Sequence, residues 1–264
     1  MRKKCIFCQR DNQKITNEHI FPDWLSKFYG ADAMCLNEGR KEDGTVTFSY
    51  ASKIFQQTRN DVCTECNSGW MSAIENAAQP ILVKMLKGKS LVLDKKKQEK
   101  IATWAMKTIL VINHHNPAPP AKQFIPEEHY AAFFEAKSVT PGNVMLLGYK
   151  PGTKFKTGDS IANNRLDLAQ HIAVPKDKLE ELKAKLERGQ RAYGATLRIA
   201  NIVFQLVGND LYDVKTHRLD MMIPQEPMRI LNPYKNKIRW PLPHSIDEVG
   251  GLEVVHNALK GAAQ

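Results

Sequence analysis

The chain has 264 residues, of which 42% are hydrophobic, so it can bury a core and is not disordered as a whole. No apolar run approaches the roughly 18 residues that cross a bilayer, and residues 1–4 lead into a cysteine motif rather than an apolar signal core. We therefore expect a cytoplasmic protein without a membrane partner. The net charge of +10 suits nucleic acid, because Lys and Arg that neutralise phosphates release condensed counterions, although a solvated basic surface is the other interpretation.

Four of the five cysteines form two Cys-x-x-Cys pairs, Cys5 with Cys8 and Cys63 with Cys66. A two-residue spacer lets both sulfurs of a pair reach one tetrahedral ion, so the pairs predict a closed, structural Zn²⁺ site. The alternatives are a redox pair, which needs a thioredoxin-like βαβ pattern, and four unrelated buried cysteines. Cys35 stands alone and is interpreted as a small buried apolar residue.

The first elements are predicted from composition and periodicity. Residues 1–68 have only short apolar runs, so a metal is expected to substitute for part of their core. Two helices follow from apolar residues that recur at three-to-four spacing: 70–86, which Gly88 ends, and 101–112, which the proline-rich stretch 116–120 stops.

The later elements are a short helix after Pro126, a strand over 144–149, an amphipathic helix over 175–188, and a β-like segment over 195–207 with a phase slip, followed by a turn signal at 209–210. The proline-rich tail is expected to wrap rather than to build regular elements. The fold class predicted is α+β.

Two domains are expected, with a boundary after residue 88. Residues 1–88 hold twelve Lys and Arg against ten Asp and Glu, whereas residues 89–264 hold 26 against 18. We therefore predict that residues 1–88 supply the chemistry. The basic α+β accessory domain over 89–264 is expected to position DNA or to mediate oligomerisation.

A second motif lies between the cysteine pairs. Glu18-His19-Ile20-Phe21-Pro22 follows the first pair, and Asn67 comes directly after the second. This arrangement resembles the HNH, or ββα-metal, endonuclease superfamily, in the variant whose two Cys-x-x-Cys pairs bracket an acidic-His-hydrophobic-x-Pro strand and whose second pair runs into Asn. The residues that carry the resemblance lie in the first third of the chain: Cys5, Cys8, Glu18, His19, Ile20, Pro22, Cys63, Cys66 and Asn67.

The resemblance implies an N-terminal HNH module in which Glu18 and Asn67 bind a catalytic Mg²⁺ or Mn²⁺ and His19 deprotonates a water. Oxygen ligands suit such a hard cation, and an imidazole suits proton abstraction near neutral pH. The products would carry 5′-phosphate and 3′-hydroxyl ends. Adjacent strand residues point to opposite sides, so Glu18 and His19 require a bulge, a distorted strand end, or a metal reached around the edge.

The sequence departs from the family pattern at several positions. Glu18 stands where Asp is usual, and its extra methylene shifts the metal or lowers its affinity. Asn67 stands where many members have His. The middle Asn of the motif is either Asn60, close to Cys63, or Asn37.

Each site residue also has a structural interpretation. His19 is then a buried, hydrogen-bonded strand histidine, Glu18 a surface carboxylate, and Asn67 a helix cap. Trp70 and Met71 are interpreted as core residues that join the zinc module to the next helix, rather than as base-stacking groups. The joint placement of Glu18, His19 and Asn67 relative to the cysteines favours catalysis.

The leading hypothesis is a metal-dependent endonuclease that acts on DNA, with RNA not excluded as a substrate, in a phage-defence setting. The first alternative is a zinc-dependent nucleic-acid-binding module without turnover, which would not require the intact trio. The second is a subunit whose nuclease is licensed by a partner, either a defence-system protein or a second copy of the chain.

Overall fold

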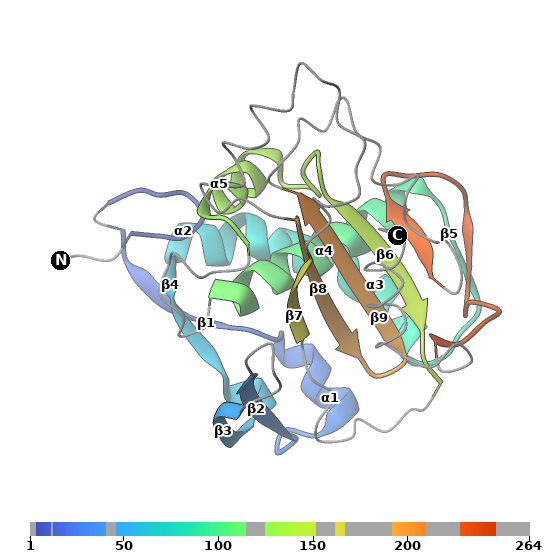
Figure 1. Cartoon of the computed structure of the whole chain (residues 1–264), viewed down its shortest axis with the longest axis horizontal. Coiled ribbons are helices and arrows are strands. Elements are labelled where there is room, and N and C mark those ends of the chain that lie inside the picture. Colours follow the sequence, from blue (N-terminus) through green and yellow to red (C-terminus); the bar gives the residue numbers. More distant parts are fainter. Residues whose placement is uncertain are drawn as a thin grey trace.

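A computed structural model of the chain describes residues 4–11, 13–40, 46–114, 125–151, 162–166, 192–209 and 228–246. The fold is mixed α+β, with helices packed against small antiparallel sheets (Figure 1). The helices are α1 (Ser26–Tyr29), α2 (Thr64–Cys66), α3 (Ser72–Leu86), α4 (Lys95–His114) and α5 (Glu127–Ala136), with a π-helical turn over Asn67–Met71 and 3₁₀ turns over Asp23–Leu25 and Ile54–Gln56. The strands are β1 (Ile15–His19), β2 (Met34–Arg40), β3 (Val46–Lys53), β4 (Thr58–Cys63), β5 (Leu91–Leu93), β6 (Val144–Tyr149), β7 (Ala162–Leu166), β8 (Ala192–Ile199), β9 (Ile202–Asn209), β10 (Arg229–Asn232) and β11 (Ile238–Trp240).

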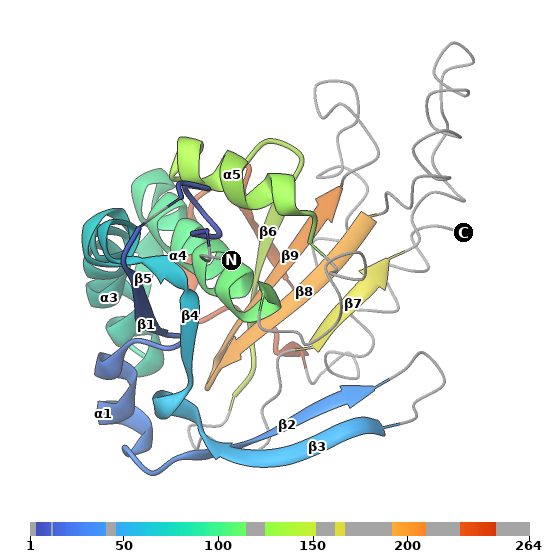
Figure 2. The same ribbon diagram turned by 90° about the vertical axis from the view of Figure 1, so that its left-hand side faces the viewer.

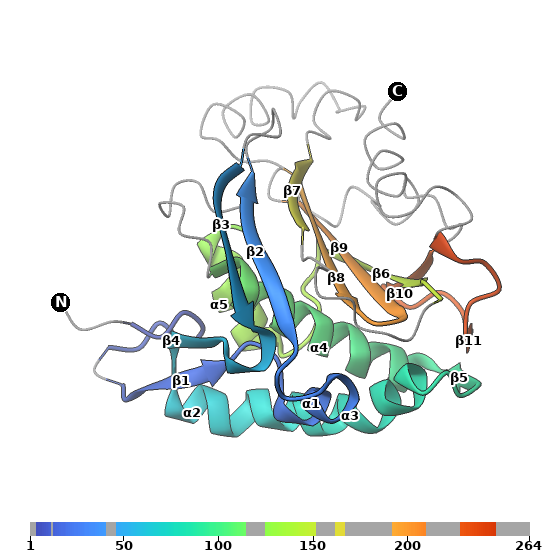
Figure 3. The same cartoon turned by 90° about the horizontal axis from the view of Figure 1, so that it is seen from below.

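The N-terminal segments form two antiparallel two-stranded ribbons. β1 pairs with β4, and β2 pairs with β3 in a long hairpin inserted between them. β4 leads directly into α2, the π-helical turn and α3, which follow one another along the chain (Figure 3). The backbone kinks at Gly69 (φ −90°, ψ −109°). The side chains before the kink therefore do not continue the rows of side chains on α3.

The predicted helix over 70–86 is confirmed as α3, which ends before Gly88 at φ +65°. There the Lys89 amide N–H donates to the Lys84 carbonyl, as expected for a glycine-terminated helix end. The second predicted helix is also confirmed, but it begins at Lys95 rather than at residue 101. Asp94 supplies the start signal, because its Oδ1 accepts a 2.9 Å hydrogen bond from the Lys97 amide.

α4 is the central helix of the molecule. It lies between α3 and the largest sheet (Figure 2), and nearly all of its residues from Ile101 to Asn113 are buried. A helix covered on several sides is expected to be apolar around most of its circumference, which suits Trp104, Ala105 and Ile109. Lys107 interrupts this apolar surface and is fully buried.

The largest sheet has five antiparallel strands in the order β10-β6-β9-β8-β7. The strand over 144–149 is confirmed as β6, and the helix after Pro126 is confirmed as α5. The β-like segment over 195–207 is two strands, because β8 and β9 pair with Ile199 opposite Ile202. The phase slip is therefore the two-residue turn Ala200-Asn201, which reverses the chain.

The prediction for the tail was wrong within the described residues. Residues 228–246 add β10 to the large sheet and β11 to β5, and Trp240 of β11 is buried. Prolines flank these strands rather than interrupt them, so they do not remove ladder hydrogen bonds. The proline-rich stretch 116–120, the predicted helix over 175–188 and residue 210 of the turn signal lie outside the described residues.

One hydrophobic cluster runs through the described part of the chain. It includes Phe7 and Leu25 from the first predicted domain and Trp104, Phe204 and Trp240 from the second. None of the helices within the described ranges combines the length and the hydropathy that a bilayer crossing requires.

Candidate metal centre and adjoining pocket

The four cysteines of the two Cys-x-x-Cys pairs converge on one point. Their Sγ atoms all lie within 4.8 Å of one another, and those of Cys8 and Cys63 are 3.8 Å apart. A tetrahedral zinc ion with Zn–S bonds of about 2.3 Å separates its sulfur ligands by about 3.8 Å. The cluster is therefore consistent with a structural zinc site, as predicted.

The thiols crowd together in a mostly buried cluster. A hydrogen bond with Cys66 lowers the pKa of Cys5 to about 4, whereas burial raises the pKa of Cys63. The Cys63 amide N–H also donates to the Cys5 sulfur over 3.4 Å. A bound divalent cation would stabilise all four groups as thiolates, which is the chemistry that this ligand set favours.

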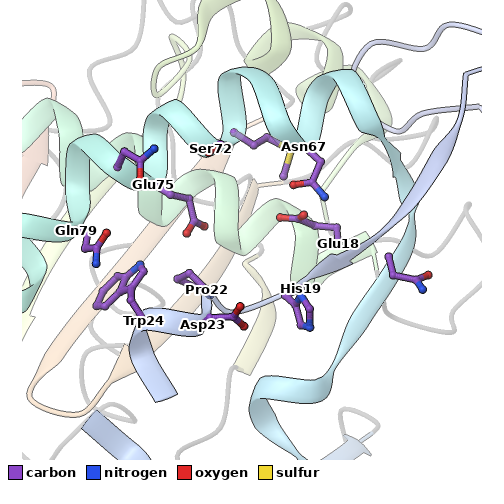
Figure 4. Close-up of a pocket in the computed structure, with 12 residues that line it drawn as sticks. Glu18, His19, Pro22, Asp23, Trp24, Asn67, Ser72, Glu75 and Gln79 are labelled. Carbon is purple, nitrogen blue, oxygen red and sulfur yellow. The ribbon is translucent and has the colours of Figure 1, made fainter. Parts of the chain in front are cut away.

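Glu18 and His19 lie at the end of β1 and point to opposite sides of the strand. Glu18 is 8% exposed and His19 is exposed. Figure 4 shows the Glu18 carboxyl group on the side of α3 and the His19 imidazole on the other side. Glu18 is therefore not a surface carboxylate, and His19 is not a buried strand histidine.

The β1–β4 pairing contains an irregularity, but it does not bring Glu18 and His19 to one side of β1. Thr16 pairs with Val62 and Glu18 with Arg59, so two residues of β4, Asn60 and Asp61, face one residue of β1. This is a β-bulge in β4. Because β1 ends at His19, both neighbouring side chains line one pocket at the strand end, although they remain on opposite sides of β1.

Asn67 is joined to β1 by a side-chain hydrogen bond. Its Nδ2 atom donates over 2.9 Å to Thr16 Oγ1. It does not act as a side-chain cap of α3, because that helix has no side-chain cap hydrogen bond. The amide oxygen is left on the side of Glu18 and the pocket (Figure 4).

One pocket of about 310 Å³ collects the three predicted catalytic residues. Its walls are the end of β1 with the following 3₁₀ turn, the π-helical turn, and the first turns of α3. The lining residues are Asn17, Glu18, His19, Pro22, Asp23, Trp24, Asn67, Met71, Ser72, Glu75, Asn76 and Gln79 (Figure 4).

Glu75 and Lys107 were not predicted as site residues. Glu75 of α3 lines the pocket, and its Oε1 atom accepts a hydrogen bond from the Lys107 ammonium group on α4. The Lys107 side chain is fully buried, and the Glu75 side chain is 19% exposed. A lysine inside the apolar pattern of the second predicted helix is the sequence signal for a buried ion pair, but it does not identify the partner.

Burial dominates the electrostatics of Glu18. It raises the pKa of the Glu18 carboxyl group to about 7, Lys107 opposes the change, and Glu75 adds to it. No described residue donates a hydrogen bond to this carboxyl group. Glu18 is thus a buried, unpartnered carboxyl group on the wall of a pocket, which is an unusual arrangement without a ligand.

Met71 is a core residue, as predicted, whereas Trp70 is partly buried and packs against α5 rather than the next helix. The Trp70 ring packs edge-on against Phe7 of the cysteine loop, with centroids 5.1 Å apart, and against Phe133 of α5 at 5.8 Å. Met71 is 1% exposed. These contacts link the cysteine cluster to α5. Asn60 is exposed in the β4 bulge, while the side chains of Asn37 and Cys35 lie outside the described residues, so the identity of the middle Asn stays a prediction.

No family model, no curated protein and no solved structure matches this chain.

Proposed function

We propose that this chain is a metal-dependent endonuclease that hydrolyses phosphodiester bonds in DNA at an HNH-type site formed by Glu18, His19 and Asn67. The observation that carries the proposal is that these residues, from segments far apart in the sequence, line one pocket. Asn67 is also adjacent in the chain to Cys66 of the metal cluster. The antiparallel β1–β4 pair followed by a helix supports the same proposal.

His19 is the general base. It is exposed and lines the pocket, so a water molecule and a phosphodiester can both reach its imidazole. A ring nitrogen takes a proton from the water, whose oxygen attacks phosphorus while the bond from phosphorus to the 3′ oxygen breaks. The 3′ oxygen leaves with a proton from solvent, so the products are a 5′-phosphate and a 3′-hydroxyl.

Glu18 and Asn67 have the properties of ligands for a hard divalent cation. The Glu18 carboxyl group is buried without a hydrogen-bond donor among the described residues, and the Asn67 amide is oriented by Thr16. Both offer oxygen atoms, which Mg²⁺ and Mn²⁺ prefer. When bound, the cation would stabilise the negative charge that develops on the phosphate and the leaving oxygen.

DNA is proposed as the substrate because the chain is basic, with a net charge of +10. Positive charge attracts a polyanion without reading its sequence. Residues 89–264, which carry the larger excess of Lys and Arg, would contact the phosphate backbone. RNA shares the same phosphate chemistry and is a substrate to test in parallel.

The experiment is a cleavage assay with zinc-loaded protein and supercoiled plasmid, single-stranded DNA and RNA, with Mg²⁺, Mn²⁺ or EDTA. Wild-type protein should nick or linearise the plasmid when a divalent cation is present. His19→Ala should lower the rate by about a hundredfold or more, the range expected for loss of a general base. His244→Ala is the matched control, because His244 lies near β11 and does not line the pocket.

Each outcome has a distinct meaning. Cleavage by wild type and His244→Ala but not by His19→Ala supports the nuclease and the role of His19. Equal cleavage by all three proteins would indicate a contaminating nuclease or another base and would overturn the assignment. Binding without cleavage by every protein would favour a nucleic-acid-binding module or a partner-licensed subunit.

A further inference from the structure

Two carboxyl groups face the same space in the pocket. Glu18 comes from β1 and Glu75 from α3, and both line the cavity of about 310 Å³. Figure 4 shows the Glu18 carboxyl group directed toward Glu75 and the Glu75 carboxyl group directed into the pocket. Glu75 follows Met71 by one helical turn and precedes Gln79 by another, so these three side chains form a row along the pocket wall.

The oxygen atoms of these two carboxyl groups are only partly paired within the described part of the chain. Lys107 is fully buried and donates to Glu75 Oε1. The Lys107 ammonium group is hydrogen-bonded to Glu75 alone, and the other Glu75 oxygen and both Glu18 oxygens lack a hydrogen-bond donor among the described residues. A divalent cation in the pocket would supply a partner for these oxygen atoms.

We propose that Glu75 is a further ligand of the divalent cation and that Lys107 is the positioning residue that holds it. This inference rests on the proposed function, because it extends the Glu18 and Asn67 ion site of that proposal. Glu75 would bind the cation through Oε2, while Oε1 keeps its hydrogen bond to Lys107. Two carboxylates, one amide oxygen and waters form a ligand set suited to Mg²⁺ or Mn²⁺.

The Glu75–Lys107 pair is better explained as a metal ligand held in position by a neighbouring lysine than as a purely structural ion pair. A structural pair between α3 and α4 would be satisfied if both carboxylate oxygens were covered by donors. Here the carboxyl group is only half paired and is accessible from the pocket, with 19% of the side chain exposed. Metal ligands are commonly held in this way by a neighbouring donor that fixes their orientation.

The test is direct titration of Mn²⁺ into zinc-loaded protein, followed by the electron paramagnetic resonance signal of free Mn²⁺. The zinc-loaded cysteine cluster should not compete, because thiolates favour softer ions than Mn²⁺. Glu75→Gln should weaken Mn²⁺ binding by about tenfold or more, the loss expected for damage to a metal site. Glu99→Gln is the matched control, because Glu99 is an exposed carboxylate on α4.

Glu75→Gln leaves Lys107 buried beside an uncharged partner, which can destabilise the single variant. A second variant is therefore needed to separate loss of the ligand from loss of folding. The double variant Glu75→Gln/Lys107→Met removes both charges and avoids an unpaired buried ammonium group. Its zinc content and circular dichroism should match the wild type, and its Mn²⁺ affinity should fall as in the single variant. Wild-type affinity in this double variant would overturn the ligand assignment.

Lys107→Met gives a readout that a structural pair would not produce. This variant keeps Glu75 but removes the Lys107 ammonium group that pairs with it. Mn²⁺ should therefore raise the melting temperature of the variant by more than it raises that of the wild type. If Glu75 does not contact the ion, Mn²⁺ should not compensate for the lost lysine. The increase in melting temperature on adding Mn²⁺ should then be equal in Lys107→Met and the wild type. An equal shift therefore contradicts the proposal.

The two proposals can fail separately. If Glu75→Gln binds Mn²⁺ as the wild type does, while His19→Ala still abolishes cleavage, the Glu75 assignment is wrong and the nuclease stands. If Mn²⁺ binding depends on Glu75 but the wild type cuts no nucleic acid, the ion site stands and the nuclease is wrong. Absence of Mn²⁺ binding to the wild type overturns the Glu75 assignment outright.

Discussion

The side chain of Asn67 is fixed to β1 by Thr16, whose Oγ1 accepts a 2.9 Å hydrogen bond from Asn67 Nδ2. Thr16 lies two residues before Glu18 on the same strand. The bond therefore sets the distance between the segment that carries Glu18 and the turn that carries Asn67. It also determines which end of the Asn67 amide faces the pocket, since the nitrogen is occupied by Thr16.

On the proposed function, Thr16→Val should slow DNA cleavage without unfolding the protein. Valine keeps the β-branched shape that suits a strand but cannot accept the Asn67 hydrogen bond. Asn67 can then rotate, and misplacement of a site group by about 1 Å can cost up to about a hundredfold in rate. We expect a loss of about tenfold to a hundredfold in the plasmid cleavage rate, measured beside thermal unfolding.

Thr64→Val is the control for this prediction. Thr64 also uses its hydroxyl group for a hydrogen bond, to the Lys14 carbonyl, but the residue is exposed and does not line the pocket. Its cleavage rate should stay near that of the wild type. Equal rates for the two variants would show that the Asn67 orientation is unimportant for turnover.

The cysteine cluster could be predicted from short motifs in the sequence. Cys5, Cys8, Cys63 and Cys66 were identified from their spacing, and they do converge. Helix α3 was predicted from local periodicity, because a helix buries residues at fixed intervals whatever it packs against. His19 was predicted to lie on a strand, and it is the last residue of β1.

The sequence did not predict contacts that depend on tertiary packing. Glu75 and Lys107 lie on different helices, and nothing local to either residue identifies the other. The hairpin of β8 and β9 was interpreted as one segment with a phase slip, because Ala200-Asn201 lacks the glycine that usually marks a two-residue turn. In both cases the missing information is which distant surfaces meet.

If the cysteine cluster holds a structural zinc ion, loss of that ion should unfold the region around the cluster. Cys66→Ser replaces a cysteine of the cluster that is 1% exposed and next to Asn67. Because metal binding free energy contributes directly to folding in such sites, we expect the variant to lose most of its zinc and to melt at a lower temperature. Zinc release with a colorimetric chelator and differential scanning fluorimetry provide the two measurements.

A cysteine control distinguishes the metal from general damage. Cys35→Ser changes a cysteine outside the cluster, so its zinc content should equal that of the wild type. If Cys66→Ser also keeps full zinc occupancy and stability, the cluster is not a metal site of the proposed kind.

Gly208 should be intolerant of any side chain. A Cβ atom built there would lie 2.0 Å from Cζ of Tyr193, whose hydroxyl group is held by Asn143 at 2.9 Å and His129 at 2.7 Å. Because the ring cannot move without breaking these bonds, Gly208→Ala should destabilise the protein by about 2–3 kcal/mol. Urea unfolding measures the change in the free energy of unfolding.

Gly148→Ala is the matched substitution in the neighbouring strand. The nearest atom to its added Cβ would be the end of the flexible Met228 side chain, at 3.2 Å. Met228 can adjust, so the expected cost is below about 1 kcal/mol. Similar losses in the two variants would contradict the role assigned to the Tyr193 ring.

The stability of the metal-free pocket should depend on the ionisation of Glu18. Burial, with a smaller contribution from Glu75, raises the pKa of its carboxyl group from 4.5 to about 7 in the folded chain, and Lys107 offsets only part of this. A raised folded-state pKa means that the protonated form is the one favoured by folding. The contribution is therefore complete below about pH 4.5 and is lost as pH rises toward and through about 7.

Glu18→Gln removes this dependence, because glutamine stays neutral. The variant should match the wild type at pH 4, and at pH 8 it should exceed the wild-type free energy of unfolding by as much as about 3 kcal/mol. Urea unfolding of zinc-loaded protein in buffer free of other divalent cations measures the difference. If the difference in the free energy of unfolding between the two proteins is the same at both pH values, the Glu18 carboxyl group is well solvated in the folded chain. Because a cation in the pocket stabilises the carboxylate, added Mn²⁺ at pH 8 should reverse the order and make the wild type the more stable protein.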